Sequence, residues 1–281
     1  MTKVVCWNTG TNRKCWYELL AMDADVALLQ EVSSIPKGLL QSVEYGGGEL
    51  SDPWSPDDYD RWPVVIKLSE RVRVEWFRRI LPYRKRAKDE MAVSGVGTIA
   101  AARVIPEEND PFIAVSMYAR WVRPHVSTNS PWKAGSPDAS THRIISDLSQ
   151  FIGHSNPRRH RILAAGDLNT FYGATADNRL CNADRARVVF DRMAAWGLEF
   201  IGPQAPDGGR QAIPTPQGLP DDTRNVPTYY TPQAGSPEKA QNQLDYVFAS
   251  QGFHNSITTR ALNDPGEWGS SDHCRILIEI N

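Results

Sequence analysis

Cysteine, long apolar runs and net charge are all scarce in this sequence, and each scarcity excludes a class of protein. The 281 residues contain four cysteines, none of them in a CxxC pair, so neither a structural zinc site nor a disulfide scaffold is expected. No apolar run approaches the length that crosses a bilayer. The first residues are polar, charged and strand-like and do not resemble a secretory leader. We therefore expect a soluble, cytoplasmic protein without a membrane partner.

The formal net charge is −2, which gives no global basic field to attract nucleic acid. Any attraction to phosphate must then be local, or must come from a bound metal ion. Hydrophobic residues make up 41% of the chain, which is ample for a core. We see no linker and no repeat of fixed period, so the sequence predicts one domain over residues 1–281 and a monomer.

Short apolar runs alternate with helical patterns, which is typical of an α/β fold. The expected strands cover residues 3–7, 26–29, 64–68, 72–77, 95–104, 112–118, 163–165, 243–249 and 273–280. The expected helices cover residues 15–22, 138–152 and 183–196. Residues 46–62 and 202–227 are rich in glycine and proline and are expected to be loops. The second loop could wall a ligand pocket, because loops of that length in a compact domain are usually functional or mobile.

The stretch 163–170 is the most informative one. Its apolar run stops at Gly166, and Asp167 and Asn169 follow two residues apart. Residues i and i+2 of an extended segment point the same way, so both side chains can face one cavity at the end of the strand. The alternative is an ordinary strand followed by a turn in which Asp or Asn bonds its own backbone.

Other polar residues also end or interrupt apolar runs, and each would be costly to bury alone. Together with the pair above they are Asn8, Glu31, Tyr118, Asp167, Asn169, Asp245, Asp272 and His273. The set fits a divalent-metal phosphoester site. The hard oxygens of Glu31, Asp272 and the Asn8 amide suit Mg²⁺, which takes one or two carboxylates and keeps several waters.

The remaining members supply groups for hydrolysis. Asp245 can orient and charge the imidazole of His273. Asp167 beside Asn169 can orient a water molecule for in-line attack. No serine or cysteine lies in a nucleophile motif, so direct attack by water is favoured over a covalent intermediate.

In chain order these residues form short motifs that span nearly the whole sequence. They are Trp7-Asn8, Gln30-Glu31, Tyr118, Gly166-Asp167-Leu168-Asn169, Leu244-Asp245-Tyr246-Val247 and Ser271-Asp272-His273. The ordered set resembles the endonuclease/exonuclease/phosphatase superfamily, which includes exonuclease III-type AP endonucleases, DNase I, inositol polyphosphate 5-phosphatases and neutral sphingomyelinases. The resemblance implies a DNase I-like four-layer α/β sandwich, in which two packed mixed β-sheets are flanked by helices. It also implies Mg²⁺- or Mn²⁺-dependent cleavage of a phosphoester by water.

The resemblance further implies that Glu31 is the main metal ligand, with Asn8 and Asp272 near the metal. The sequence departs from the AP endonuclease pattern after two of the motifs. Thr9-Gly10 follows Asn8, where those enzymes usually have arginine or asparagine a couple of residues later, and Val32-Ser33 follows Glu31, where they usually have threonine and lysine. The branch of the superfamily therefore stays open.

For catalysis, the resemblance implies that Asp167 orients or deprotonates the attacking water. Asn169 and Tyr118 would contact the phosphate, and His273, held by Asp245, would stabilise the charge of the phosphorane-like state. Both Asp167 and His273 can touch water or phosphate, so the sequence leaves the identity of the general base open.

Substrate contacts are expected from residues close to these motifs. Arg120, Trp121 and Arg123 follow Tyr118 directly, and Trp268 could stack on a base or sugar, although packing is the commoner fate of tryptophan. The basic segment 78–88 could track a nucleic-acid backbone, or could be a solvated loop or hairpin.

Three functional hypotheses follow. The first is a nuclease that cleaves DNA or RNA phosphodiesters. The second is a phosphatase or phosphodiesterase that acts on a small-molecule or lipid-linked phosphate. The third is a binding protein that keeps the fold without catalysis, and the filled set of catalytic-type positions argues against it.

Overall fold

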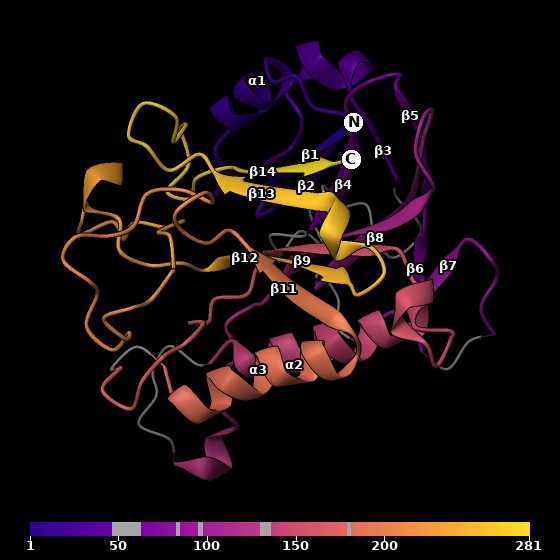
Figure 1. Ribbon diagram of the computed structural model, residues 1–281. Coiled ribbons are helices and arrows are strands. Elements are labelled where there is room, and N and C mark those ends of the chain that lie inside the picture. The colour runs from indigo at the N-terminus through magenta and orange to yellow at the C-terminus, as the bar shows by residue number, and fades with distance from the viewer. Residues whose placement is uncertain (47–62, 83–84, 95–97, 130–135, 179–180) are drawn as a thin grey trace.

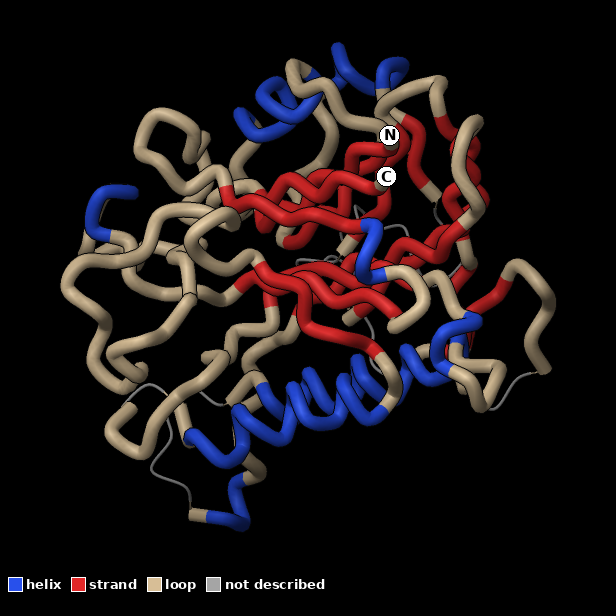
Figure 2. The backbone as a smooth tube through the Cα atoms, viewed as in Figure 1, coloured by secondary structure: helices blue, strands red, loops and turns tan. Residues whose placement is uncertain are grey.

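The computed structural model describes residues 1–46, 63–82, 85–94, 98–129, 136–178 and 181–281. Within these residues two six-stranded sheets pack face to face. Helix α1 covers the outer face of the first sheet, and helices α2 and α3 cover the outer face of the second, so the layers run helix, sheet, sheet, helix (Figure 1). Figure 2 shows the same order, with the strands in the middle and the longest helices along one side. This is the expected four-layer α/β sandwich.

The first sheet runs in the order β13 (Ile257–Ala261), β14 (Ile276–Ile280), β1 (Thr2–Asn8), β2 (Val26–Gln30), β4 (Val64–Lys67) and β3 (Glu44–Tyr45). The second runs in the order β11 (Leu198–Gly202), β12 (Asp245–Ser250), β10 (Ile162–Asp167), β9 (Phe112–Tyr118), β8 (Ile99–Pro106) and β5 (Val72–Trp76). A small sheet pairs β6 (Arg78–Ile80) with β7 (Glu90–Ala92). The α-helices are α1 (Lys14–Leu20), α2 (Asp138–Leu148) and α3 (Ala183–Ala195). Short 3₁₀ helices are η1 (Lys37–Ser42), η2 (Val126–Thr128), η3 (Ser149–Phe151), η4 (Pro157–Arg159), η5 (Pro237–Lys239) and η6 (His254–Ser256).

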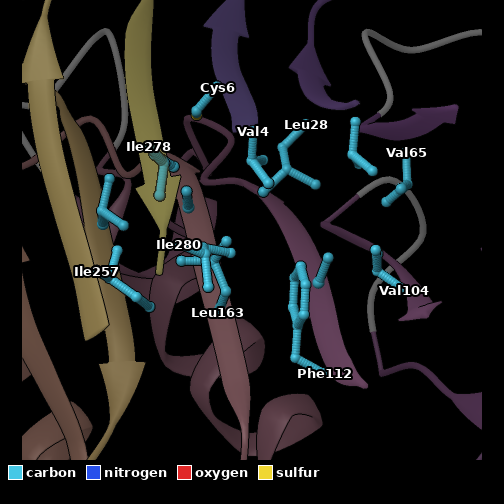
Figure 3. Close-up of a cluster of buried hydrophobic side chains, with 14 of the residues drawn as sticks. Val4, Cys6, Leu28, Val65, Val104, Phe112, Leu163, Ile257, Ile278 and Ile280 are labelled. Carbon is cyan, nitrogen blue, oxygen red and sulfur yellow. The ribbon is translucent and has the colours of Figure 1, made fainter. Parts of the chain in front are cut away.

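Alternate residues of each central strand point to opposite faces of the sheet and therefore pack into two different hydrophobic cores. In β1, Val4 points into the core between the sheets, whereas Val5 points toward α1. In β10, Leu163 points into the inter-sheet core, whereas Ala164 points toward α2 and α3. Figure 3 shows the inter-sheet core, where Val4 from the first sheet and Phe112 and Leu163 from the second gather in one cluster. Strands buried on both faces read as continuous apolar runs, which is why the sequence revealed them.

Most expected elements are present within a few residues of their predicted bounds. The last strand is shorter than expected, because it begins at Ile276 and leaves His273 in the preceding loop. Five strands were not expected: β3, β11 and β13 are edge strands of the large sheets, and β6 and β7 form the small sheet. Residues 95–97 of one expected strand, and most of the expected loop 46–62, lie outside the described residues. None of the helices in the described part of the chain is long and apolar enough to cross a bilayer.

The topology brings strand ends from both sheets to one edge. Strands β1 and β2 are parallel in the first sheet, and β9 and β10 are parallel in the second. Strand β2 packs against both β9 and β10, and β1 packs against β10. Strands β12 and β14 are antiparallel to β10 and β1, so their first residues lie at the edge where β10 and β1 end.

Candidate active site

One cavity of about 350 Å³ lies at the edge where these strands end. Its lining is Asn8, Glu31, Tyr118, Trp121, Asp167, Asn169, Phe171, Tyr229, Thr231, Asn242, Leu244, Asp272 and His273. Of the eight motif residues expected from the sequence, seven line this cavity, and Asp245 contacts His273 from behind. The fold therefore brings together residues that are up to 265 positions apart in the chain (Asn8 to His273).

The Asp167 carboxylate is held by three N–H donors. Its Oδ1 accepts a hydrogen bond from the Asn169 backbone (2.8 Å), and its Oδ2 accepts bonds from the side-chain amides of Asn8 (2.9 Å) and Asn169 (3.0 Å). Asn169 lies beyond the strand with a φ of +48°, a left-handed conformation that asparagine tolerates. The two side chains face one cavity as expected, but this turn, and not an extended i, i+2 spacing, brings them together.

The His273 imidazole lies between two carboxylates. Its Nδ1 is 2.8 Å from Asp245 Oδ2, and its Nε2 is 4.0 Å from Asp167 Oδ2. Asp245 is the first residue of β12 and pairs directly with Asp167 across the sheet. The Tyr229 ring packs against the imidazole, with ring centres 4.7 Å apart. Because Asp245 engages Nδ1, the Nε2 edge is the one that faces the cavity.

Burial and charge shift the titration of both groups. Burial raises the pKa of Asp167 to about 8, a rise that the charge of His273 opposes and the charges of Asp245 and Glu31 increase. Burial by itself lowers the pKa of His273, but the charge and hydrogen bond of Asp245, helped by Asp167, outweigh it and raise that pKa to about 10. The imidazole is therefore cationic at neutral pH in the metal-free protein.

Glu31 is held in an unusual backbone conformation. Its φ is +47°, which is uncommon for a residue other than glycine and costs on the order of 1–3 kcal/mol. Its carbonyl oxygen accepts hydrogen bonds from the Thr11 backbone (2.7 Å) and the Thr9 hydroxyl (2.9 Å). Its carboxylate accepts a bond from the Tyr118 hydroxyl (2.7 Å). These bonds aim the carboxylate at the cavity.

Gly10 explains one departure from the AP endonuclease pattern. Its φ is +52°, and a Cβ atom there would lie 3.0 Å from Oδ1 of Asp272. Its backbone N–H donates to Oδ1 of Asn8 (3.0 Å). A larger residue at this position would therefore crowd a predicted metal ligand.

The loop that carries Asp272 and His273 is fixed by residues that the sequence analysis missed. Glu18 of α1 accepts hydrogen bonds from the Ser270 backbone (3.1 Å) and from the Ser270 hydroxyl. The Ser271 hydroxyl donates to the carbonyl oxygen of Asn8 (2.7 Å). Glu18 has no local signal in the sequence, because it lies in an ordinary amphipathic helix.

Comparison with known proteins agrees with this geometry. The endonuclease/exonuclease/phosphatase family is matched over residues 6–273 of the chain. The chain belongs to this family. No curated protein matches the sequence significantly.

Solved structures share the fold of this family member at low identity. The endonuclease domain of TRAS1, a telomere-specific non-LTR retrotransposon, is 16% identical with a TM-score of 0.60, and the match covers 100% of this chain and 99% of that one. The AP endonuclease LMAP from Leishmania major is 16% identical with a TM-score of 0.61, covering 100% of this chain and 87% of that one. An AP endonuclease from Archaeoglobus fulgidus is 13% identical with a TM-score of 0.59, and both chains are fully covered.

The donor set of this family member fits a hard divalent cation. Glu31, Asp167 and Asp272 line the cavity beside His273, and Asp245 contacts the imidazole from behind, so four carboxyl groups lie at or directly behind the cavity wall. No arginine or lysine of the described chain lines the cavity. The described residues also hold no group of three or more His, Cys, Asp or Glu side chains arranged around a metal. A cation here would have few protein ligands and would keep waters, as Mg²⁺ and Mn²⁺ do.

Of the three expected substrate contacts that do not line the cavity, one is wrong and two stay predictions. Trp268 is fully buried, packs against Tyr230 and donates its indole N–H to Ser271, so the expectation that it stacks on a substrate is wrong. Large aromatic residues are most often buried, and here a loop rich in glycine and serine covers the ring. Arg120 and Arg123 do not line the cavity, and their contact with substrate stays a prediction.

Two other expected features also lie away from the cavity. No described residue of the loop 202–227 lines it; this loop borders a separate cavity instead, and residues near 229–231 and 242–244 form the wall. In the basic segment, Arg78 pairs with Glu90 and Arg79 is buried, so this part is not a solvated loop. Tyr83 and Arg84 lie outside the described residues.

Proposed function

We propose that this protein hydrolyses phosphodiester bonds of DNA or RNA by in-line attack of water, with Mg²⁺ or Mn²⁺ as cofactor. The observation that carries the proposal is the composition of the cavity: Glu31, Asp167 and Asp272 line it, Asp245 contacts His273 behind it, and none of the described arginines or lysines lines it. A phosphate group would be repelled by these carboxylates unless a cation neutralised them. Membership of the endonuclease/exonuclease/phosphatase family supports the reaction type.

Glu31, Asp272 and the Asn8 amide are the residues that would hold the cation. When bound, the cation would supply positive charge to the phosphate and its leaving oxygen. The Tyr118 hydroxyl donates a hydrogen bond to the Glu31 carboxylate, and the Asn8 side-chain amide donates one to the Asp167 carboxylate. Asn8 would therefore contribute both to the metal site and to the position of Asp167.

In this proposal Asp167 acts in its ionised form, which gains in population as the pH rises toward its pKa of about 8; it orients the attacking water and accepts its proton, and Asn169 positions both Asp167 and the phosphate. His273 carries positive charge because of Asp245, so its Nε2–H donates to a phosphate oxygen. The 4.0 Å between His273 Nε2 and Asp167 Oδ2 supports the proposal that both groups act on one phosphate.

A cleavage assay tests the proposal. Wild type, Asp167→Asn and Asp110→Asn would be incubated with Mg²⁺ and with supercoiled plasmid, single-stranded DNA, an abasic duplex, RNA and small phosphoesters. Asp110 is a matched control, because its side chain is 81% exposed and lies away from the cavity. We expect Asp167→Asn to lose turnover by at least 10²-fold on a polynucleotide, with wild-type activity in the control. Retained turnover in Asp167→Asn, with melting curves showing all proteins folded, would refute the site.

The cavity volume favours one second candidate function. About 350 Å³ is near the low end for small-molecule sites, so the cavity can take one phosphorylated small molecule. Phosphate release from a small or lipid-linked phosphoester, with no polynucleotide cleaved by the same preparation, would favour this alternative.

A further inference from the structure

Trp121 exposes a large aromatic surface at the catalytic cavity. Its side chain is 48% exposed, and it lines the cavity together with Asp167 and Asn169. It also borders the small neighbouring cavity near Arg185. Ligand-binding cavities are lined predominantly by hydrophobic and aromatic side chains, so an exposed tryptophan in the wall of this cavity is placed to contact a ligand.

The backbone around Trp121 is fixed at several points. Val122 and Ser136 exchange two backbone hydrogen bonds (3.1 and 3.0 Å). The Arg120 N–H donates to the Ser140 hydroxyl on α2 (3.1 Å). Trp121 therefore lies between two anchored neighbours, and its position does not have to be ordered when a ligand binds.

The same segment is tied to the catalytic strand. The Ala119 N–H donates to the Asp167 carbonyl oxygen (2.8 Å), and the Ala119 carbonyl oxygen accepts from the Asn169 amide (3.1 Å). Only Arg120 separates this anchor from Trp121. These bonds fix the backbone next to Trp121 relative to the strand that carries Asp167.

The chemistry of the cavity indicates which ligand would cover the ring. Among the residues that the structure describes, the wall has no arginine or lysine for a second phosphate, but it has the aromatic surfaces of Trp121, Phe171 and Tyr229. Nucleobases are planar and uncharged, and they stack on aromatic side chains regardless of sequence. We propose that Trp121 stacks on a nucleobase next to the scissile phosphate, so that the site selects polynucleotides over phosphodiesters that lack bases. This inference rests on the proposed nuclease function.

A binding experiment separates base stacking from backbone contact. Affinities would be measured by fluorescence anisotropy, with Mg²⁺ present, for a labelled oligothymidylate and for an oligomer of the same length built from base-free tetrahydrofuran spacers. The proteins would be full-length chains carrying Asp167→Asn to prevent turnover, with or without Trp121→Ala or Trp121→Phe. The matched control is Trp196→Ala, because Trp196 is 40% exposed but borders a different cavity.

We expect Trp121→Ala to weaken oligothymidylate binding by roughly 5- to 150-fold, the factor for one stacked base. Binding of the base-free oligomer should change by less than about twofold, because it has no ring to stack on Trp121. Trp121→Phe should retain most of the affinity, and Trp196→Ala should bind both oligomers as the parent does.

Three outcomes would overturn the inference. Equal weakening on both oligomers would show that Trp121 contacts the backbone or holds the cavity in shape. Unchanged binding in Trp121→Ala would show that Trp121 does not contact the substrate. The proposed function would still stand in that case if wild type cleaves a polynucleotide and Asp167→Asn does not. Absence of both polynucleotide binding and wild-type cleavage would overturn the proposed function as well.

Discussion

Replacing Asp245 with asparagine tests whether His273 acts as a cation. At an effective dielectric constant of about 20, the 2.8 Å contact between the two side chains corresponds to an attraction of about 6 kcal/mol. The rise of the His273 pKa from 6.5 to about 10 corresponds to about 5 kcal/mol. The net rise also includes burial, which lowers the pKa, and the charges of Asp167 and Asp272, which raise it; Asp245 is the largest of the raising contributions, so a neutral partner should leave the imidazole mostly uncharged above neutral pH. Turnover should then fall by roughly 10²- to 10⁴-fold.

The pH dependence distinguishes lost charge from lost structure. In Asp245→Asn the imidazole has lost the partner that raised its pKa, so lowering the pH should restore its proton. The rate deficit relative to wild type should therefore shrink as the pH falls from 8 to 6. A deficit that does not change with pH, or a rate within about threefold of wild type, would refute the role assigned to His273.

The assay is kcat on the best polynucleotide substrate between pH 6 and pH 9, with melting curves for each protein. Asp147→Asn is a matched control, because Asp147 is a buried aspartate that accepts hydrogen bonds from the Ser94 backbone and lies away from the cavity. It should change stability without a pH-dependent loss of turnover.

Three further predictions concern stability. Gly166→Ala should destabilise the fold by about 1–3 kcal/mol in urea denaturation, because the added Cβ would lie 1.9 Å from the Met117 carbonyl oxygen. Gly38→Ala is the control and should change the stability little, because the space around Gly38 is open. Equal effects of the two substitutions would refute the steric argument. Mg²⁺ should raise the melting temperature of wild type, and a rise of the same size in Glu31→Gln would contradict the ligand assignment. In metal-free protein the raised pKa of His273 contributes stability that is fully present below about pH 6.5 and is lost as the pH rises toward about 10. The urea midpoint of wild type should therefore fall between pH 7 and pH 9.5 by more than that of His273→Gln, and parallel curves would disprove this linkage.

Two predicted site residues show why local pattern is only a partial guide. Glu31 and Asn169 both have left-handed backbones, at φ values of +47° and +48°. Glycine would be the usual choice at both positions, and asparagine tolerates this conformation whereas glutamate does not favour it. The Glu31 backbone is held by hydrogen bonds that Thr9 and Thr11 donate to its carbonyl oxygen, and the Asn169 backbone by the bond that its N–H donates to the Asp167 carboxylate. These left-handed backbone conformations therefore depend on contacts that form only in the folded site.

Trp121 and Trp268 show the limit for substrate contacts. Both are tryptophans close to a motif, and the sequence analysis named Trp268 as the one that could stack on a base or sugar. The fold buries Trp268 beneath the loop that leads to Asp272, and it leaves Trp121 at the cavity wall. Exposure is set by which loop covers a ring, and that depends on chain segments that sequence periodicity does not connect.

The sequence by itself determined the strand cores, the helices and the polar residues that end the strands. It did so because apolar runs and periodicity are local properties, and because a polar residue at the end of a buried run must have a partner. Only the tertiary structure decided which ends meet. Asp245 faces Asp167 because β12 runs antiparallel to β10, and Glu18 reaches Ser270 because α1 packs on the first sheet. Edge strands such as β13 were hidden from the sequence, since a half-exposed strand gains its stability from its neighbours and not from its own residues.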